Sequence, residues 1–143
     1  MEEEWREVEV EWQGGGAFSG SNGTGGRVLM GRIGEQAGLS PMELVLAALG
    51  GCTGVDVVSI LEKKRQPLKE FRVQVRGKRS QTHPRIYTEI EVKYLLWGER
   101  LDEQAVRQAI ALSEEKYCSV SAMLKPTVKL HFSYQIMEKA TEI

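Results

Sequence analysis

The sequence is poor in the residues that hold disulfide scaffolds or zinc sites together. Its 143 residues include only two cysteines and two histidines, too few for a secreted disulfide framework or an obvious zinc site. It also lacks an excess of one charge, because 19 basic and 20 acidic side chains leave a net charge of −1. A near-neutral chain has no overall electrostatic attraction to nucleic acid or anionic lipid. We therefore expect no metal site and no nucleic-acid partner.

Long apolar runs and a targeting segment are also missing. The uncharged stretch in the middle of the chain, residues 44–55, has 12 residues, whereas a membrane-spanning helix needs about 20. The first residues, MEEEWREVEVEW, are acidic, whereas a signal peptide begins basic and continues apolar. We expect a cytoplasmic protein without membrane contact. In that compartment a cysteine pair is more often chemical than structural.

The length and composition suit a single domain over residues 1–143 with a proper core. Alternating apolar residues predict a half-buried strand through Val8, Val10 and Trp12 and another over residues 27–33. Seven of the 15 glycines fall between residues 14 and 26. Their spacing fits tight hairpins and not a phosphate-binding loop, because no GK[ST] follows.

The clearest local pattern begins at Ser40-Pro41-Met42-Glu43. Serine at the cap, proline at the first helical position and glutamate at the third form a capping box. An apolar run follows, and Lys63-Lys64-Arg65 then Pro67 end the helix. This helix of about 24 residues is nearly apolar all round in its first half, so we expect it to be central and buried on most sides, partly by a second subunit.

The rest of the chain predicts an α+β architecture of antiparallel strands around that long buried helix. The expected elements are a long hairpin of strands over residues 71–76 and 86–96, a helix capped by Asp102 that runs to about Tyr117, a short helix over 119–124 and a strand over 128–136.

Cys52 lies inside the long helix, beside Gly50, Gly51 and Gly54. A glycine inside a helix costs about 1 kcal/mol relative to alanine, so these three indicate a close approach by another backbone or by a substrate. Two readings of Cys52 remain open, a small packed core residue or a reactive thiol. A reactive thiol here needs a neighbouring cation, because the helix dipole acts only on the first turn.

Cys118 and Glu43 each allow two readings as well. Cys118 is a core cysteine at a helix junction, or a thiol whose pKa the following helix N-terminus lowers. Glu43 either only caps the N-terminus of the helix or also takes part in the chemistry. Nine helical steps separate Glu43 from Cys52 by about 13.5 Å along the helix axis and place them on opposite faces. If both act on one small substrate, one must come from a partner chain. The candidate cations are Arg32 and Arg27.

Three segments carry a resemblance to a known family: SPMELVLAALGGC, which ends at Cys52, DVVSIL, and SEEKYCSV, which contains Cys118. They resemble the OsmC/Ohr family of thiol peroxidases, and most closely its YhfA-like branch, over residues 8–134. The resemblance implies an OsmC-like fold and an intertwined homodimer with active sites at the subunit interface. It also implies chemistry without a cofactor.

The resemblance assigns roles to four residues. Cys52 matches the thiolate that attacks an organic hydroperoxide and becomes a sulfenic acid, and Cys118 matches the thiol that then closes a disulfide with it. Glu43 matches the family's glutamate and Arg32 its arginine, with Arg27 as the second candidate. An external dithiol would return the electrons.

One departure favours a second hypothesis. Ser119 follows Cys118, at a position where family members with peroxidase activity often have proline. The alternative is a non-enzymatic OsmC-like dimer that binds a small apolar ligand or a protein partner.

Overall fold

The computed structural model describes residues 4–137, which divide into two compact units, one extending to Val45 and one beginning at Leu46. The elements of the first unit are β1 (Glu9–Gly14), β2 (Ala17–Ser21), β3 (Arg27–Met30), β4 (Arg32–Ile33) and β5 (Gln36–Ala37). Helix α1 (Pro41–Lys63) begins in the first unit and continues in the second. The single domain over residues 1–143 stays a prediction.

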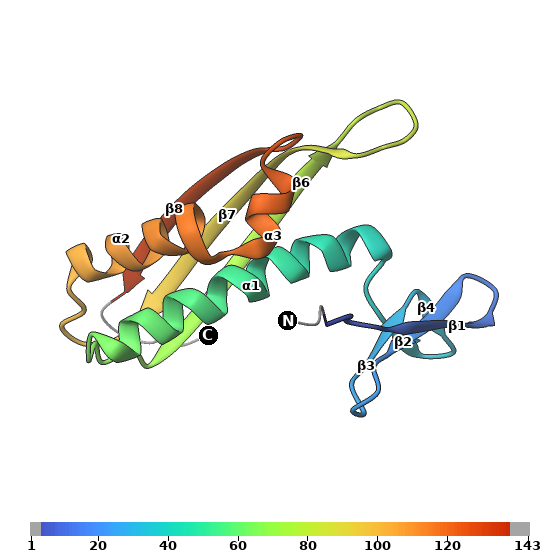
Figure 1. The fold of residues 1–143 in the computed structure, drawn as a ribbon, viewed down its shortest axis with the longest axis horizontal. Helices are drawn as coiled ribbons and strands as arrows, with labels where there is room; N and C mark the ends of the chain where they lie inside the picture. Colours follow the sequence, from blue (N-terminus) through green and yellow to red (C-terminus); the bar gives the residue numbers. More distant parts are fainter. Residues whose placement is uncertain (1–3, 138–143) are drawn as a thin grey trace. The chain divides into compact units, whose positions relative to one another are not determined.

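The glycine-rich segment forms hairpins, as predicted. Strands β1, β2 and β3 pair antiparallel in that order (Figure 1). Gly15 and Gly25 turn between them with φ of +55° and +95°, a backbone conformation that glycine adopts at little cost. The alternation correctly predicted β1, but its apolar residues are not half-buried. Val10 is 55% and Trp12 65% exposed.

The single strand predicted over residues 27–33 is wrong, because the chain turns at Gly31. Its φ is +81°, and a side chain there would meet the Gly16 carbonyl oxygen at 2.5 Å. The turn separates β3 from β4, which pairs antiparallel with β5. Arg27 therefore begins one strand and Arg32 begins another.

The capping box forms at the start of α1 as predicted. The Glu43 backbone N–H donates to Ser40 Oγ at 3.1 Å, and the Ser40 N–H donates to Glu43 Oε1 at 2.9 Å. These two bonds satisfy amides that have no partner inside the helix. The helix has 23 residues and ends at Lys63, close to the predicted length.

The predicted burial of α1 on most sides is wrong for the single chain. The buried residues lie from Leu49 onward, on one side of the helix. Val55, on another side, is 71% exposed. The apolar first half therefore has no complete cover within the residues that the structure describes.

Helix α1 is long and apolar enough to cross a membrane, by length and composition alone. Its mean hydropathy reaches 2.0 over an 18-residue window, a third of which is buried. The prediction that no segment is long enough to span a membrane considered only the 12 uncharged residues and not the whole helix. Core helices of soluble proteins pass the same test, and α1 packs its Leu49, Val57 and Leu61 inside the second unit. We therefore interpret α1 as a helix that packs one side against the core of the second unit, not as a membrane span.

The second unit contains a three-stranded sheet in the order β6 (Glu70–Arg79), β7 (Tyr87–Trp97) and β8 (Lys129–Met137). Strands β6 and β7 form the predicted antiparallel hairpin. Strand β8, however, runs parallel to β7, although only antiparallel pairing was expected. The helical segment between β7 and β8 returns the chain to the same end of the sheet, which a parallel neighbour requires.

The predicted inward face of β7 is right from Ile90 onward and wrong before it. Ile90, Val92, Tyr94 and Leu96 are buried, but Tyr87 is buried where Ile86 was expected. The pairing register shifts between residues 78 and 79 of β6. Because side chains alternate along a strand, one extra residue moves the neighbouring side chains to the other face.

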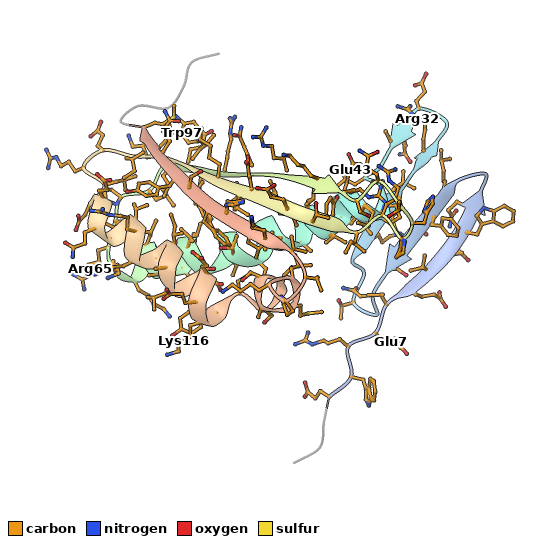
Figure 2. All side chains as sticks on the ribbon, turned by 90° about the horizontal axis from the view of Figure 1, so that it is seen from above. Glu7, Arg32, Glu43, Arg65, Trp97 and Lys116 are labelled. Carbon is orange, nitrogen blue, oxygen red and sulfur yellow. The ribbon has the colours of Figure 1, made fainter. Side chains whose placement is uncertain are left out.

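The crossover contains α2 (Glu103–Leu112), the π-helical turn η1 (Ser113–Tyr117) and α3 (Ser119–Leu124). The Asp102 side chain caps α2 by accepting from the Gln104 N–H at 3.0 Å. Its predicted face is buried, with Val106 and Ala109 fully enclosed. Figures 1 and 2 show the helices of this unit on one face of the sheet, where they cover the core.

Candidate active site

Cys52 and Cys118 lie next to each other in the second unit. The two thiols are close enough that Cys52 contributes to the raised pKa of Cys118, and neither thiol is in a disulfide. Cys52 is partly exposed on α1, whereas Cys118, between η1 and α3, is only 3% exposed. The sequence left open whether the two cysteines meet, since they are 66 positions apart. The fold brings them together as one accessible and one buried thiol.

The pKa of Cys118 is raised, which corrects the expectation of a lowered one. The thiol does lie at the start of α3, where its Sγ accepts from the Ser121 N–H at 3.4 Å. Burial nevertheless raises the pKa of Cys118 more than this bond lowers it, and the adjacent Cys52 raises the pKa further. Cys118 is therefore a neutral thiol near pH 7.

Two of the three helix glycines are explained by packing against the sheet. A Cβ added at Gly50 would lie 3.0 Å from Val75 Cγ2, and one at Gly54 would lie 3.4 Å from Phe71 Cε2. These glycines let α1 approach β6 closely, so their reason is not access to Cys52. Gly51 differs, because it is exposed and a side chain there would meet open space.

An apolar groove of about 560 Å³ runs beside this contact between α1 and β6. Gly51, Val55 and Val58 line it from the helix, and Phe71 and Val73 line it from the strand. The groove is open to solvent in the single chain. It offers a surface for an apolar ligand or for another protein surface, and Gly51, the chain neighbour of Cys52, lies on it.

Sequence reasoning missed a buried chain of polar side chains behind the two cysteines. Thr53 Oγ1 lies 2.6 Å from Tyr94 Oη and 2.7 Å from Ser113 Oγ. Ser113 Oγ donates to Asp56 Oδ2 at 2.8 Å. Burial raises the pKa of Tyr94 to about 12. The available signal was the pair of polar residues three positions apart, Thr53 and Asp56, inside an otherwise apolar helix.

Glu43 and Arg32 belong to the first unit, whereas both cysteines belong to the second. Glu43 has the structural role that its position predicted, in the capping box. Arg32 is exposed on β4 and forms no ion pair among residues 4–137. Figure 2 shows its side chain extending outward from the β4–β5 hairpin. Their roles in chemistry, and that of Arg27, remain predictions.

Comparison with known proteins identifies the family. The sequence model of the OsmC family, described as OsmC-like protein, matches residues 34–133. The chain belongs to the OsmC-like family. The matched region includes Glu43, Cys52 and Cys118, whereas Arg27 and Arg32 lie before it. This confirms the family resemblance seen in the cysteine motifs.

Relatives of this OsmC-like chain confirm its mixed α+β fold. Protein YhfA of Escherichia coli K12 is 41% identical over 132 residues, which cover 92% of this chain and 98% of that protein. The crystal structure of a hypothetical protein from Aquifex aeolicus VF5 has a TM-score of 0.86 at 43% identity, covering 96% of this chain and all of that one. An organic hydroperoxide resistance protein OsmC from Legionella pneumophila has a TM-score of 0.67 at 13% identity, with coverages of 93% and 99%.

The comparisons establish the family and the fold of this chain. The Legionella protein is described as an organic hydroperoxide resistance protein, but an identity of 13% relates only the folds. Among residues 4–137, no three His, Cys, Asp or Glu side chains gather in a group that could hold a metal ion. The reactive groups that the fold brings together here are the two thiols.

Proposed function

We propose that this OsmC-like protein is a cytoplasmic thiol peroxidase that reduces organic hydroperoxides. The observation that supports it is the contact between a partly exposed thiol, Cys52, and a buried one, Cys118, from distant parts of the chain. A peroxide can reach the first thiol, and the second is in place to capture the product. The long apolar helix α1 that carries Cys52 favours an organic hydroperoxide over hydrogen peroxide.

The reaction has three balanced steps. The Cys52 thiolate attacks the terminal peroxide oxygen, the O–O bond breaks, and the alcohol leaves after taking up a proton, so that Cys52 becomes a sulfenic acid. The Cys118 sulfur then attacks the Cys52 sulfur, forming the disulfide and releasing water. An external dithiol reduces that disulfide by exchange and is itself oxidised to a disulfide.

The proposal assigns supporting roles to Arg32 and Glu43 in an intertwined homodimer whose active sites lie at the subunit interface. An arginine beside Cys52 would favour its thiolate and orient the peroxide, and Glu43 would hold that arginine. Arg27 is the second candidate for the cation. The helix spacing between Glu43 and Cys52 is what calls for two chains. The uncovered apolar side of α1, with Val55 71% exposed, supports a covering subunit.

Thiol counting by intact mass tests the proposal. The reduced protein receives one equivalent of cumene hydroperoxide and is quenched with an alkylating agent after seconds. We expect both thiols to disappear and the mass to fall by two hydrogen atoms, as disulfide closure requires. In Cys118→Ser, Cys52 should instead gain one oxygen atom. Both thiols remaining alkylatable in the wild type would refute the peroxidase.

The raised pKa of Cys118 adds a pH dependence to the second step. The attacking form is the thiolate, and burial makes that form scarce near neutral pH. Disulfide closure should therefore accelerate as the pH rises and continue to accelerate past about 8.5, the ordinary value for cysteine. Stopped-flow measurement of closure from pH 6 to 10 checks this. A rate that levels off below pH 8 would contradict it.

The apolar groove also favours a second candidate function, a non-enzymatic dimer that binds a small apolar ligand or a protein partner. This hypothesis predicts slow thiols and unchanged binding when Cys52 is replaced by serine. Titration of wild type and Cys52→Ser with an apolar fluorescent probe, beside the thiol count, separates the two functions.

A further inference from the structure

The buried polar chain behind the cysteines has one direction. Ser113 Oγ donates its only hydrogen to Asp56 Oδ2, since a carboxylate oxygen only accepts. Ser113 must then accept from Thr53, and Thr53, with its hydrogen already used, must accept from Tyr94. The three bonds therefore run from Tyr94 to Thr53 to Ser113 to Asp56. No alternative orientation satisfies all four groups, so the arrangement is rigid.

This chain connects the two segments that carry the thiols. Thr53 follows Cys52 on α1, and it is fully buried. Ser113 is also fully buried, and its backbone carbonyl accepts the Cys118 N–H at 2.8 Å. The 2.7 Å bond between Thr53 and Ser113 thus joins a residue next to Cys52 with the residue that holds the Cys118 backbone, although the two are 60 positions apart.

The π-helical turn makes Ser113 the residue that holds Cys118. In a regular α-helix the Cys118 N–H would bond to the carbonyl of Glu114, four residues earlier. Here it bonds to Ser113, five residues earlier, and the Lys125 Nζ donates to the freed Glu114 carbonyl at 2.7 Å. Such turns re-aim a backbone at functional sites. The orientation of the Cys118 backbone, and with it that of the thiol, therefore depends on the position of Ser113.

We propose that Thr53 and Ser113 are positioning residues for closure of the Cys52–Cys118 disulfide. A disulfide tolerates a narrow range of distance and dihedral angle, and its closure gains from thiols that are already oriented. The Thr53–Ser113 bond fixes the segment of each cysteine against the other without touching either sulfur. The inference rests on the proposed function only in taking Cys52 and Cys118 as the pair that closes.

The effective concentration of the two thiols, measured in glutathione redox buffers, tests the proposal without peroxide. Thr53→Val keeps the shape and removes the hydroxyl, and we expect it to lower the effective concentration about tenfold. Thr53→Ser restores the hydroxyl and should return the value to within about twofold of wild type. Thr88→Val, the same change at an exposed threonine of β7, is the matched control and should have no effect.

A second readout distinguishes positioning from loss of the fold. In a Cys118→Ser background, Cys52 should form a sulfenic acid with cumene hydroperoxide equally fast with and without the added Thr53→Val substitution, because that step does not involve Ser113. If Thr53→Val does not fold, Ser113→Ala replaces it, since alanine keeps the carbonyl that holds Cys118. The same tenfold loss is expected there.

The outcomes separate the inference from the proposed function. If wild type forms no disulfide at any ratio of oxidised to reduced glutathione, the Cys52–Cys118 pair and hence the proposed function fail. If wild type closes the disulfide and Thr53→Val closes it with an unchanged effective concentration, the positioning role is wrong while the peroxidase stands. If Thr53→Val lowers the effective concentration and Thr53→Ser does not restore it, the role of the hydroxyl is also wrong.

Discussion

The two compact units differ in what they bury. Between residues 4 and 45 only Ala17 and Gly20 are buried, and β1 exposes all six of its residues. The second unit encloses side chains from α1, β7 and α2 around Tyr94. A small sheet with an uncovered apolar face has little independent stability. The second unit therefore carries the core and both thiols, whereas the first needs a surface to cover it.

The candidate chemistry divides in the same way. Cys52 and Cys118 lie in the unit with the core, where burial raises the pKa of Cys118. Arg32 and Glu43 lie in the unit without one. Substitutions in each unit test whether this division is real.

The largest difference should appear between two leucines. Leu61 is fully buried on α1, whereas Leu39 of the first unit is 43% exposed. Leu61→Ala should lower the free energy of unfolding by about 2–5 kcal/mol, because it removes a packed side chain and leaves a cavity. Leu39→Ala should cost less than about 1 kcal/mol. Urea unfolding monitored by circular dichroism measures both. Equal losses of unfolding free energy would contradict the assignment of the core to the second unit.

A smaller difference is expected between two neighbouring glycines of α1. Gly50→Val places a side chain against Val75 and should cost about 1–3 kcal/mol by overpacking. Gly51→Val meets open space in the single chain and should leave monomer stability within about 0.5 kcal/mol. Light scattering adds the association state. A Gly51→Val protein that loses a dimer present in wild type would show that a second subunit covers this side.

Alkaline pH should weaken the second unit, which contains all four tyrosines. The folded pKa of Tyr94, about 12, exceeds the ordinary value of about 10. Its stabilising contribution is complete below pH 10 and is lost as the pH rises toward 12, by on the order of 2 kcal/mol. Unfolding of wild type and Tyr94→Phe from pH 8 to 11.5 measures this. The free energy of unfolding should fall less steeply with pH in the variant than in wild type. Parallel curves would exclude Tyr94 as the cause of the alkaline destabilisation.

The smallest structural effect is expected at Glu43. Ser40→Ala should cost about 1 kcal/mol by removing the cap, whereas Glu43→Gln should cost almost nothing, since glutamine also completes a capping box. Peroxide turnover then separates structure from chemistry. A slower Glu43→Gln enzyme with unchanged thermal stability would support a charge role at the active site. Unchanged turnover would leave Glu43 with the capping role alone.

Local sequence patterns predicted the elements well but not how they meet. Ser40 and Glu43 formed the expected cap because a capping box depends only on neighbours in the chain. The parallel pairing of β8 and the register shift that buries Tyr87 instead of Ile86 depend on partners far away in sequence, which alternation does not reveal. The same holds for the site. The motifs singled out Cys52 and Cys118, but the raised pKa of Cys118 arises from burial in the assembled core.

The parallel pairing of β8 has a consequence for synthesis of the chain on the ribosome. Cys52 emerges 66 residues before Cys118, and the crossover that carries Cys118 cannot be closed until β8 has been made and docked beside β7. Such non-local contacts form late, because a long loop must first be closed. During that interval the nascent helix has a lone thiol without its partner. Under the proposed chemistry, a peroxide that meets the unfinished chain would leave a sulfenic acid on Cys52, and Cys118 could reach it only after β8 has docked beside β7.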